Sequence, residues 1–226
     1  MKPLNALQHF DEIEEILDET YGPRKLTPGG DPVSTLVATI LSQSTSDTNS
    51  SRAFASLRER FPTWQRVVDA KTNQVVDAIR AGGLANQKAP RIQEALEEIH
   101  ERYGDYSLDV LNELPLDEAK VALTSIDGVG PKTAACVLLF ALGRPALPVD
   151  THVHRVASRL PLVEPGTNPA RAHATLEALM DDDAERTYRF HVEMIAHGRA
   201  ICHARNPKCA ICPLRRYCEY AATHST

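Results

Sequence analysis

The amino-acid sequence predicts an all-α fold. No segment of the 226 residues shows sustained alternation of apolar and polar residues, whereas apolar residues recur at three- and four-residue spacing along most of the chain. Gly and Pro mark turns of about two to six residues between helical stretches of roughly ten residues, which is typical of helical bundles. The composition, 42% hydrophobic and 24% charged, is ordinary for a globular chain with room for one large domain or two small ones.

The first two predicted helices each have one apolar face. The first spans residues 7–22 and stops at Gly22. Its apolar face consists of Leu7, Phe10, Ile13, Ile16 and Leu17. The second helix spans residues 33–44, and its apolar face consists of Val33, Leu36, Val37, Ile40 and Leu41.

The next predicted helices are shorter or more polar. Asp47 can cap a helix over residues 48–61, and short helices follow over 63–70 and 74–83. A longer helix is predicted over residues 89–104, where the acidic outer face is most simply a solvated surface.

A glycine turn between two helices forms the central motif of the chain. A helix is predicted from Leu116 to Ile126; the turn "DGVG" follows, and Pro131 suits the first position of a helix that runs to Gly143. Gly128 and Gly130 would let the backbone approach a partner closely, and a helix N-terminus attracts phosphate. The turn is therefore either a clamp for a phosphate backbone or an ordinary packing corner between helices.

Lys132 and Asp150 are the two candidate chemical groups near this motif. Lys132 lies in the first turn of the second helix, where the helix dipole disfavours a cation and favours the neutral, nucleophilic amine. Asp150 comes just before another predicted helix, and on its own it would be read as an N-cap.

Four of the five cysteines are clustered near the C-terminus, with the spacing C-x6-C-x2-C-x5-C. The N-terminal residues do not resemble a signal peptide, and the longest apolar stretch is too short to span a bilayer, so we expect a reducing cytoplasm and no disulfides. Zinc sites usually join two short knuckles, whereas only one pair here is short, which favours an iron–sulfur cluster over zinc or unligated thiols. The four candidate ligands are Cys202, Cys209, Cys212 and Cys218, and the remaining Cys136 reads as a buried small hydrophobe.

Basic charge is concentrated around these cysteines. The whole chain has a net charge of −5 and a pI of about 6.0, yet residues 194–218 contain five Lys or Arg and no Asp or Glu. This charge either balances the thiolates of a cluster or faces the phosphates of a nucleic acid.

Together these motifs resemble one protein family. The segment "IDGVGPKTAACVLLFALGRPALPVDTHVHRVASRL" looks like the helix–hairpin–helix–Gly/Pro…Asp signature of the endonuclease III family of DNA glycosylases. The segment "HGRAICHARNPKCAICPLRRYC" resembles the iron–sulfur loop of that family, and "ILSQSTSD" and "GGLANQKA" resemble its two DNA-probing segments. The resemblance runs from about Leu4 to Tyr220.

The resemblance implies two helical domains that flank a DNA-binding cleft. Residues 25–144 would form a six-helix barrel that contains the helix-hairpin-helix at about 116–143. Residues 1–24 and 145–226 would form the domain of a [4Fe–4S] cluster. The cofactor and its four cysteine ligands are implied in the same way.

The resemblance also implies a bifunctional enzyme of base excision repair. The damaged nucleotide would be flipped into the cleft. Asp150 would support base loss, and Lys132 would attack the sugar to form a Schiff base, after which β-elimination cuts the strand 3′ to the lesion. Oxidised pyrimidines such as thymine glycol, and abasic sites, are the substrates that the family prefers.

Other DNA contacts are assigned by resemblance alone. Leu84 matches the family's hydrophobic wedge. His152 would line the pocket, although a hydrogen-bonded structural role is slightly favoured, and Arg199 could equally reach phosphate or brace the cluster. At the place of Ser44, which follows Gln43, the family commonly has a glutamine that probes the opposite strand. Serine is too short for that task, which indicates weaker DNA binding or an altered lesion preference.

Two other functions were weighed against this one. The chain could be a catalytically weak paralogue that binds lesions or senses redox state, which Ser44 and the acidic net charge allow but Lys132 and Asp150 argue against. It could also be a glycosylase for mismatched or alkylated bases, and Lys132 argues against most relatives of that kind. We expect a monomer that binds damaged double-stranded DNA, has no membrane contact, and lies in the cytoplasm on a prokaryotic-type nucleoid.

Overall fold

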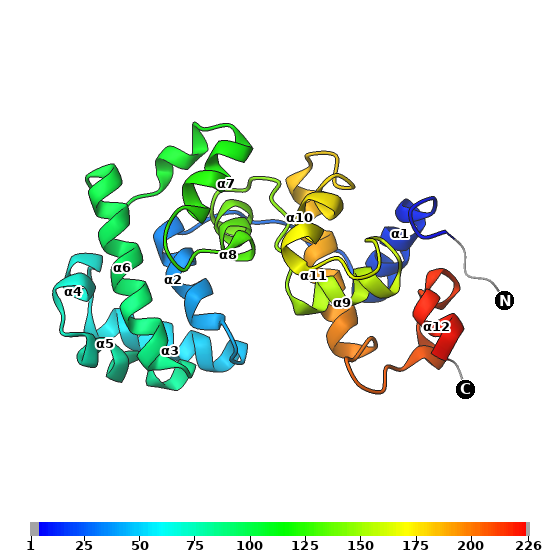
Figure 1. The fold of residues 1–226 in the computed structure, drawn as a ribbon, viewed down its shortest axis with the longest axis horizontal. Coiled ribbons are helices and arrows are strands. Elements are labelled where there is room, and N and C mark those ends of the chain that lie inside the picture. Colours follow the sequence, from blue (N-terminus) through cyan, green and yellow to red (C-terminus); the bar gives the residue numbers. More distant parts are fainter. Residues whose placement is uncertain (1–4, 225–226) are drawn as a thin grey trace. The chain divides into compact units, whose positions relative to one another are not determined.

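The computed structural model describes residues 5–224, and every regular element in this part of the chain is helical (Figure 1). The all-α prediction is therefore confirmed. Residues 1–4 and 225–226 lie outside the described part. Both stretches belong to the segments that were predicted to form the cluster domain. The chain divides into two compact units. One consists of Pro28–Arg144, and the other combines the residues up to Thr27 with those from Pro145 onward.

Seven helices build the unit Pro28–Arg144. They are α2 (Pro32–Ser42), α3 (Asp47–Arg60), α4 (Trp64–Asp69), α5 (Thr72–Ile79), α6 (Ala85–Tyr103), α7 (Leu116–Thr124) and α8 (Pro131–Cys136). The predicted apolar face of α2 is buried along its whole length. A π-helical stretch, Val137–Ala141, continues α8, and Cys136 is buried there as expected.

The start of α2 shows how the sequence sets a helix boundary. Asp31 caps the helix: its carboxylate accepts hydrogen bonds from the backbone N–H groups of Val33 and Ser34, each at 3.0 Å. Pro32 follows at the first helical position. Asp31 also accepts a hydrogen bond from Trp64 Nε1 at 3.2 Å, which ties α4 to this corner.

Several predicted helix starts were wrong by one to four residues, and those of α3 and α6 show why. Ser46, not Asp47, caps α3, because the Ser46 hydroxyl accepts the N–H of Asn49 at 3.3 Å while Asp47 is already helical. The helix predicted from residue 89 begins at Ala85 and contains Pro90 as its sixth residue, where the proline removes one helical hydrogen bond.

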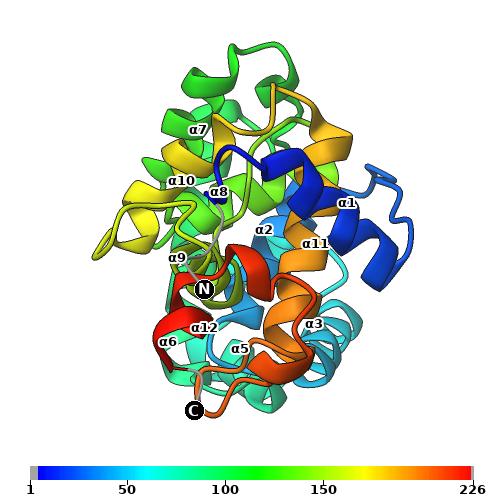
Figure 2. The same cartoon turned by 90° about the vertical axis from the view of Figure 1, so that its right-hand side faces the viewer.

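The second unit combines the N-terminal helix with the C-terminal third of the chain. Its helices are α1 (Phe10–Tyr21), α9 (Thr151–Arg159), α10 (Pro169–Glu177), α11 (Ala184–Ala200) and α12 (Glu219–His224). In Figures 1 and 2, α1 in blue lies beside α11 in orange, and the ring of Phe10 packs against that of Phe190 in a tilted arrangement with ring centroids 5.4 Å apart. Leu7, predicted as part of the apolar face of α1, precedes the helix and is half exposed.

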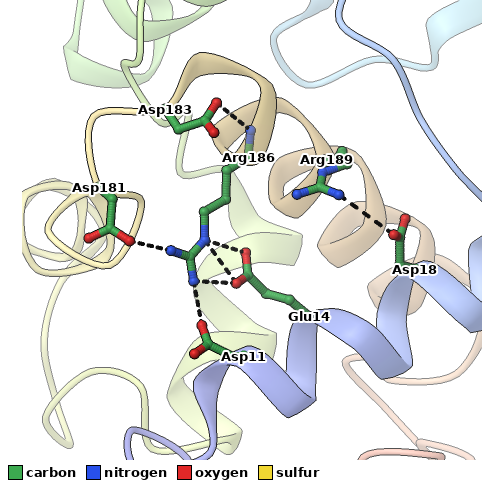
Figure 3. Close-up of polar contacts among 7 residues, drawn as sticks. All are labelled: Asp11, Glu14, Asp18, Asp181, Asp183, Arg186 and Arg189. Carbon is green, nitrogen blue, oxygen red and sulfur yellow. Dashed lines mark hydrogen bonds and ion pairs between the residues drawn. The ribbon is translucent and has the colours of Figure 1, made fainter.

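Arg186 of α11 ties this helix to α1 through charged groups (Figure 3). Its guanidinium donates two hydrogen bonds from Nε to Glu14, at 2.9 and 3.1 Å, and one from Nη2 to Asp11 at 2.7 Å. Asp181, in the turn before α11, also pairs with Arg186. The hydrogen-bonded Glu14 raises the pKa of Arg186, so the arginine stays charged in this network.

No helix in the described part of the chain has the length and apolar character required to cross a membrane.

Candidate active site and cysteine loop

The glycine turn between α7 and α8 has the geometry that its sequence requires. Gly128 has a φ of +77°, a conformation that other residues seldom adopt. Gly130 caps α8 with an ordinary extended backbone, and a Cβ added to it would meet no atom within 4 Å. The space in front of the α8 N-terminus is therefore open at Gly130.

Lys132 is the second residue of α8 and is partly buried. Within its own unit, its ammonium makes no hydrogen bond or ion pair. A lysine in the first turn of a helix lies in an unfavourable field, and here no neighbouring carboxylate of that unit compensates for it. The arrangement leaves the amine available for an external partner.

Asp150 caps α9 in the other unit. Its Oδ1 atom accepts the backbone N–H groups of both His152 and Val153, each at 2.8 Å. Because one oxygen takes both cap hydrogen bonds, the second carboxylate oxygen is left out of the cap. The cap that the sequence predicts is present, and it fixes the carboxylate at a helix N-terminus.

His152 is held by its neighbours on α9 and α11. Its Nδ1 atom lies 3.0 Å from Arg155 Nη2, and a guanidinium can only donate, so Nδ1 accepts and the neutral ring carries its proton on Nε2. Burial, chiefly, lowers the pKa of His152. A Cβ on Gly198 would lie 3.0 Å from both side chains, which explains the glycine before Arg199. Arg199 itself is exposed in the last turn of α11.

Two turns of the first unit carry the residues predicted to probe DNA. The 43–44 turn follows α2 and contains Gln43 and Ser44; the 83–84 turn precedes α6 and contains Leu84. Ser44 and Leu84 adopt left-handed backbone conformations, with φ values of 54° and 52°. The side chain of Leu84 is 49% exposed, although it is large and apolar. Such conformations store strain and often mark functional turns.

The four cysteines line one cavity in the second unit. The other residues around it are Val156, Arg159, Leu160, His197, Ile201, Pro207, Leu214, Tyr220 and Ala221. Within residues 5–224, no three His, Cys, Asp or Glu side chains converge on a position for a single metal ion. The four thiols share one cavity, and four cysteine thiolates are the usual ligands of an iron–sulfur cluster.

Hydrogen-bonding groups lie beside two of the sulfur atoms, and Arg159 is a donor to one of them. Arg159 Nη1 lies 3.2 Å from Cys202 Sγ, and the same atom donates to the carbonyl of His203 at 2.7 Å. His197 Nε2 lies 3.5 Å from Cys212 Sγ, and its Nδ1 lies 2.9 Å from the hydroxyl of Tyr21. Donors of this kind stabilise thiolate ligands and orient them.

The thiols are also strongly desolvated. Burial raises the pKa of Cys212 to about 12, and burial likewise raises the pKa of Cys218. Positive charge is needed to hold such thiols as thiolates, and iron ions supply it. The donor set, the desolvation and the cavity all fit an iron–sulfur cluster.

Sequence reasoning missed several residues that organise these sites. Arg159 and His197 contact cluster cysteines, and Lys88 is buried between the two probing turns. His197 stands in "HGR", five residues before Cys202, and Lys88 stands in "ANQKA", which like "GPKTA" follows a glycine turn and opens a helix. Arg159 has no comparable local signal, because its partners lie more than forty residues further along the chain.

Comparisons with known proteins agree with this geometry. Residues 37–181 match the model of the HhH-GPD superfamily base excision DNA repair protein, and residues 202–218 match the iron–sulfur binding domain of endonuclease III. Endonuclease III of Thermotoga maritima is 37% identical over 190 residues, which cover 84% of each chain. Endonuclease III of Sulfolobus acidocaldarius is also 37% identical, over 82% of this chain and 81% of its own.

A candidate DNA glycosylase of Arabidopsis thaliana is 38% identical over 74% of this chain, and the match spans 56% of the plant protein. A solved non-covalent endonuclease III–DNA complex superposes with a TM-score of 0.79 at 27% identity, over 96% of both chains. A trapped endonuclease III–DNA covalent intermediate gives a TM-score of 0.78 at the same identity, over 96% of this chain and 97% of the other. The chain belongs to the endonuclease III family of the HhH-GPD superfamily: it is a base excision repair DNA glycosylase that carries a [4Fe–4S] cluster.

Proposed function

We propose that this protein is a bifunctional glycosylase and abasic-site lyase that removes oxidised pyrimidines of the thymine glycol type from duplex DNA. The observation that carries the proposal is Lys132, an amine at the N-terminus of α8 with no partner in its own unit. A monofunctional glycosylase needs only a water molecule and has no use for an amine at this place.

Lys132 and Asp150 divide the chemistry between them. The Asp150 oxygen outside the α9 cap stabilises positive charge on the sugar as the bond from C1′ to the base breaks. The Lys132 amine forms a bond to C1′, the sugar ring opens, and an iminium results. Loss of a proton from C2′ then expels the 3′ phosphate, and water hydrolyses the imine to release the lysine. Both groups come from one chain, so a monomer suffices.

DNA is held by backbone groups and by local positive charge. The open space at Gly130 admits a phosphate to the N–H groups of α8, and this contact needs no net positive charge on the protein. The loop of residues 202–218 supplies Arg205, Lys208, Arg215 and Arg216. In the proposed ligand set, Cys202, Cys209, Cys212 and Cys218 hold the cluster, which fixes the shape of this basic loop. Because the reaction transfers no electron, the cluster acts structurally in it. Binding to chromosomal DNA would place the enzyme on the nucleoid.

The 43–44 and 83–84 turns open the duplex. Leu84 presents an exposed apolar side chain that fills the space left by the extruded base. Ser44 is shorter than the glutamine common at this place in the family, so it reads the opposite base less well, and His152 and Arg199 complete the contacts near the flipped nucleotide. The enzyme is accordingly a specialised paralogue, with slower turnover on thymine glycol DNA than a generalist relative; equal turnover would contradict this.

A covalent trap tests the proposal directly. The cluster-loaded protein is incubated with a duplex that contains one abasic site, borohydride is added, and the adduct is measured on a gel. We expect an adduct with the natural protein and none with Lys132→Ala. Lys120→Ala is the matched control: it removes a partly buried lysine of α7, from the same hairpin, and should leave the adduct intact.

The outcomes separate the candidate functions. An adduct that persists in Lys132→Ala would assign the Schiff base to another amine. No adduct with a protein that binds the duplex and keeps its brown cluster would favour a monofunctional glycosylase or a lesion binder, and cleavage of a thymine glycol strand after hot alkali would then distinguish those two.

A further inference from the structure

Lys88 is a fully buried lysine in the first turns of α6. Lys88 is 2% exposed, and its side chain is one of the largest in the core of its unit. Its Nζ atom donates to two backbone carbonyls, that of Leu41 at 2.7 Å and that of Gly82 at 2.8 Å. Burying an amine is unfavourable unless its hydrogen-bonding groups are satisfied, so an apolar side chain would fill the core here more simply than a lysine.

The two acceptors lie just before the two turns that were assigned to DNA probing, Leu41 in the last turn of α2 and Gly82 at the end of a short 3-10 helix, Arg80–Gly82. Leu41 lies two residues before Gln43, and Gly82 lies two residues before Leu84. The acceptor carbonyls are 47 and 6 residues from Lys88 in sequence, so one side chain joins segments that are far apart in the chain. The left-handed residues Ser44 and Leu84 follow these acceptors by three and two residues.

The backbone at Gly82 is tightly packed against α3 and the end of α2. A Cβ added to Gly82 would lie 3.0 Å from Cβ of Ala53 in α3, and 3.8 Å from the carbonyl oxygen of Leu41. The end of α2, the start of the 83–84 turn and α3 therefore meet at one point, and Lys88 supplies the polar contact there. A shift of the backbone at Leu41 or Gly82, where each turn is anchored, would break a buried hydrogen bond.

We propose that Lys88 is a positioning residue for lesion probing: it holds the 43–44 and 83–84 turns at one fixed separation, so that both enter the duplex together. This inference deepens the proposed function and rests on it. Two strained turns held independently would relax independently, whereas a shared donor makes movement of one turn unfavourable for the other.

The protonation state of Lys88 is compatible with this role. Burial lowers the pKa of Lys88. A neutral amine still has two N–H groups, one for each carbonyl, so the tie persists in both forms.

The first experiment measures how far the two Lys88 hydrogen bonds protect the two turns in the free protein. Amide hydrogen exchange is followed in Lys88→Met, which keeps the length and apolar stem of the side chain but removes the donor. We expect faster exchange in residues 42–46 and 82–86 and unchanged exchange in α7 and α8. Lys88→Arg, which keeps donors, should restore the protection. If Lys88→Met does not fold, Lys88→Gln, with a shorter amide donor, allows the same comparison.

The second experiment measures the effect on DNA. Single-turnover trapping is compared on an abasic duplex and on the same abasic strand alone, where there is no stack to open and no opposite base to probe. For Lys88→Met we expect a loss on the order of 10-fold to 100-fold on the duplex and little change on the single strand. In a double-mutant cycle, Leu84→Ala should add little to Lys88→Met on the duplex, because both remove the same function.

Gln93→Leu is the matched control. Gln93 is also buried on α6 and also donates to backbone carbonyls, those of Val67 at 2.9 Å and Ala70 at 2.8 Å, but these close α4 rather than the probing turns. It should lower thermal stability without changing the ratio of duplex to single-strand trapping. The inference is overturned if Gln93→Leu changes that ratio as Lys88→Met does, or if Lys88→Met changes neither the ratio nor the exchange. Absence of any adduct on either DNA would overturn the proposed function instead, while the exchange data would still report on Lys88.

Discussion

At the scale of single residues, Glu193 shows how burial makes stability depend on pH. It lies on α11, is 2% exposed, and its Oε1 atom has no hydrogen-bond partner in the described structure. Burial, chiefly, raises the pKa of Glu193 from 4.5 to about 8, and the nearby Asp18 carboxylate of α1 contributes. The folded protein therefore binds a proton that the unfolded chain releases between these pH values.

The sign of the effect follows from linkage. The contribution of Glu193 to stability is complete below about pH 4.5 and is lost as the pH rises through about 8. Glu193→Gln, which mimics the protonated form, should therefore be more stable than the natural protein at pH 8, by on the order of 2 kcal/mol, and should match it near pH 4.5. Denaturant unfolding at both pH values measures this.

The exposed Glu15 of α1 provides the control for this prediction. Glu15→Gln removes one negative charge from the same surface without a buried carboxyl. A gain at pH 8 as large as that of Glu193→Gln would attribute the effect to net charge and contradict the prediction.

The sequence predicted some of these residues and not others, for a physical reason. Asp150, Pro131 and Gly128 were assigned their local roles correctly, because an N-cap, a first-turn proline and a left-handed turn depend on neighbours within a few residues. Lys88 and Glu193 were missed, because burial of a charged group is decided by distant segments. The catalytic and DNA-contact assignments stay predictions until the trapping experiments are done.

At the scale of secondary structure, the contact between α1 and α11 depends on a pair of partly buried charges. The side chains of Arg186 and Glu14 are each 17% exposed, and their shortest contact is 2.5 Å. Arg186→Met leaves the Glu14 carboxylate desolvated without its partner. We expect a loss of about 2–3 kcal/mol in the free energy of unfolding.

A double substitution tests that cause. Arg186→Met with Glu14→Met removes both charges and should recover much of the stability, since two packed apolar side chains leave no uncompensated ion. Urea unfolding of the single and double variants gives the coupling energy. Losses that simply add would show that the pair is not the source of the effect.

Helix existence was predicted better than helix boundaries. The apolar face of α2 was correct at every position, because period and burial coincide there. The start of α3 was misplaced because Ser46 and Asp47 are both plausible caps. The start of α6 was misplaced because Pro90 suggested a helix N-terminus, whereas the helix already begins at Ala85. The π-helical stretch after α8 had no signal in the apolar run that contains it.

At the scale of the whole molecule, the cluster site belongs to one unit only. Cys202 and Cys218 are part of the apolar core formed by α1, α9, α10, α11 and the C-terminal segment, which includes Leu214 and Tyr217. Removal of the [4Fe–4S] cluster should therefore loosen this core and leave the Pro28–Arg144 unit intact. We expect faster amide exchange over residues 202–221 and unchanged exchange in α2 to α6, measured by mass spectrometry before and after chelation.

Reconstitution is the control for this measurement. Iron and sulfide added back should restore the slow exchange, which would exclude irreversible damage. Equal acceleration in both units would show instead that the molecule unfolds as one body and that the cluster stabilises all of it.

The division of the chain has a consequence for its synthesis on the ribosome. Residues 28–144 are continuous and can fold as soon as they emerge, whereas α1, made earlier, packs against α11, made much later. The apolar residues Phe10, Ile13 and Leu17 therefore stay without their partners while more than 160 further residues are translated. At roughly 5–20 residues per second, this exposure lasts on the order of ten seconds or more, and during that time the apolar face of α1 is open to chaperones and to aggregation.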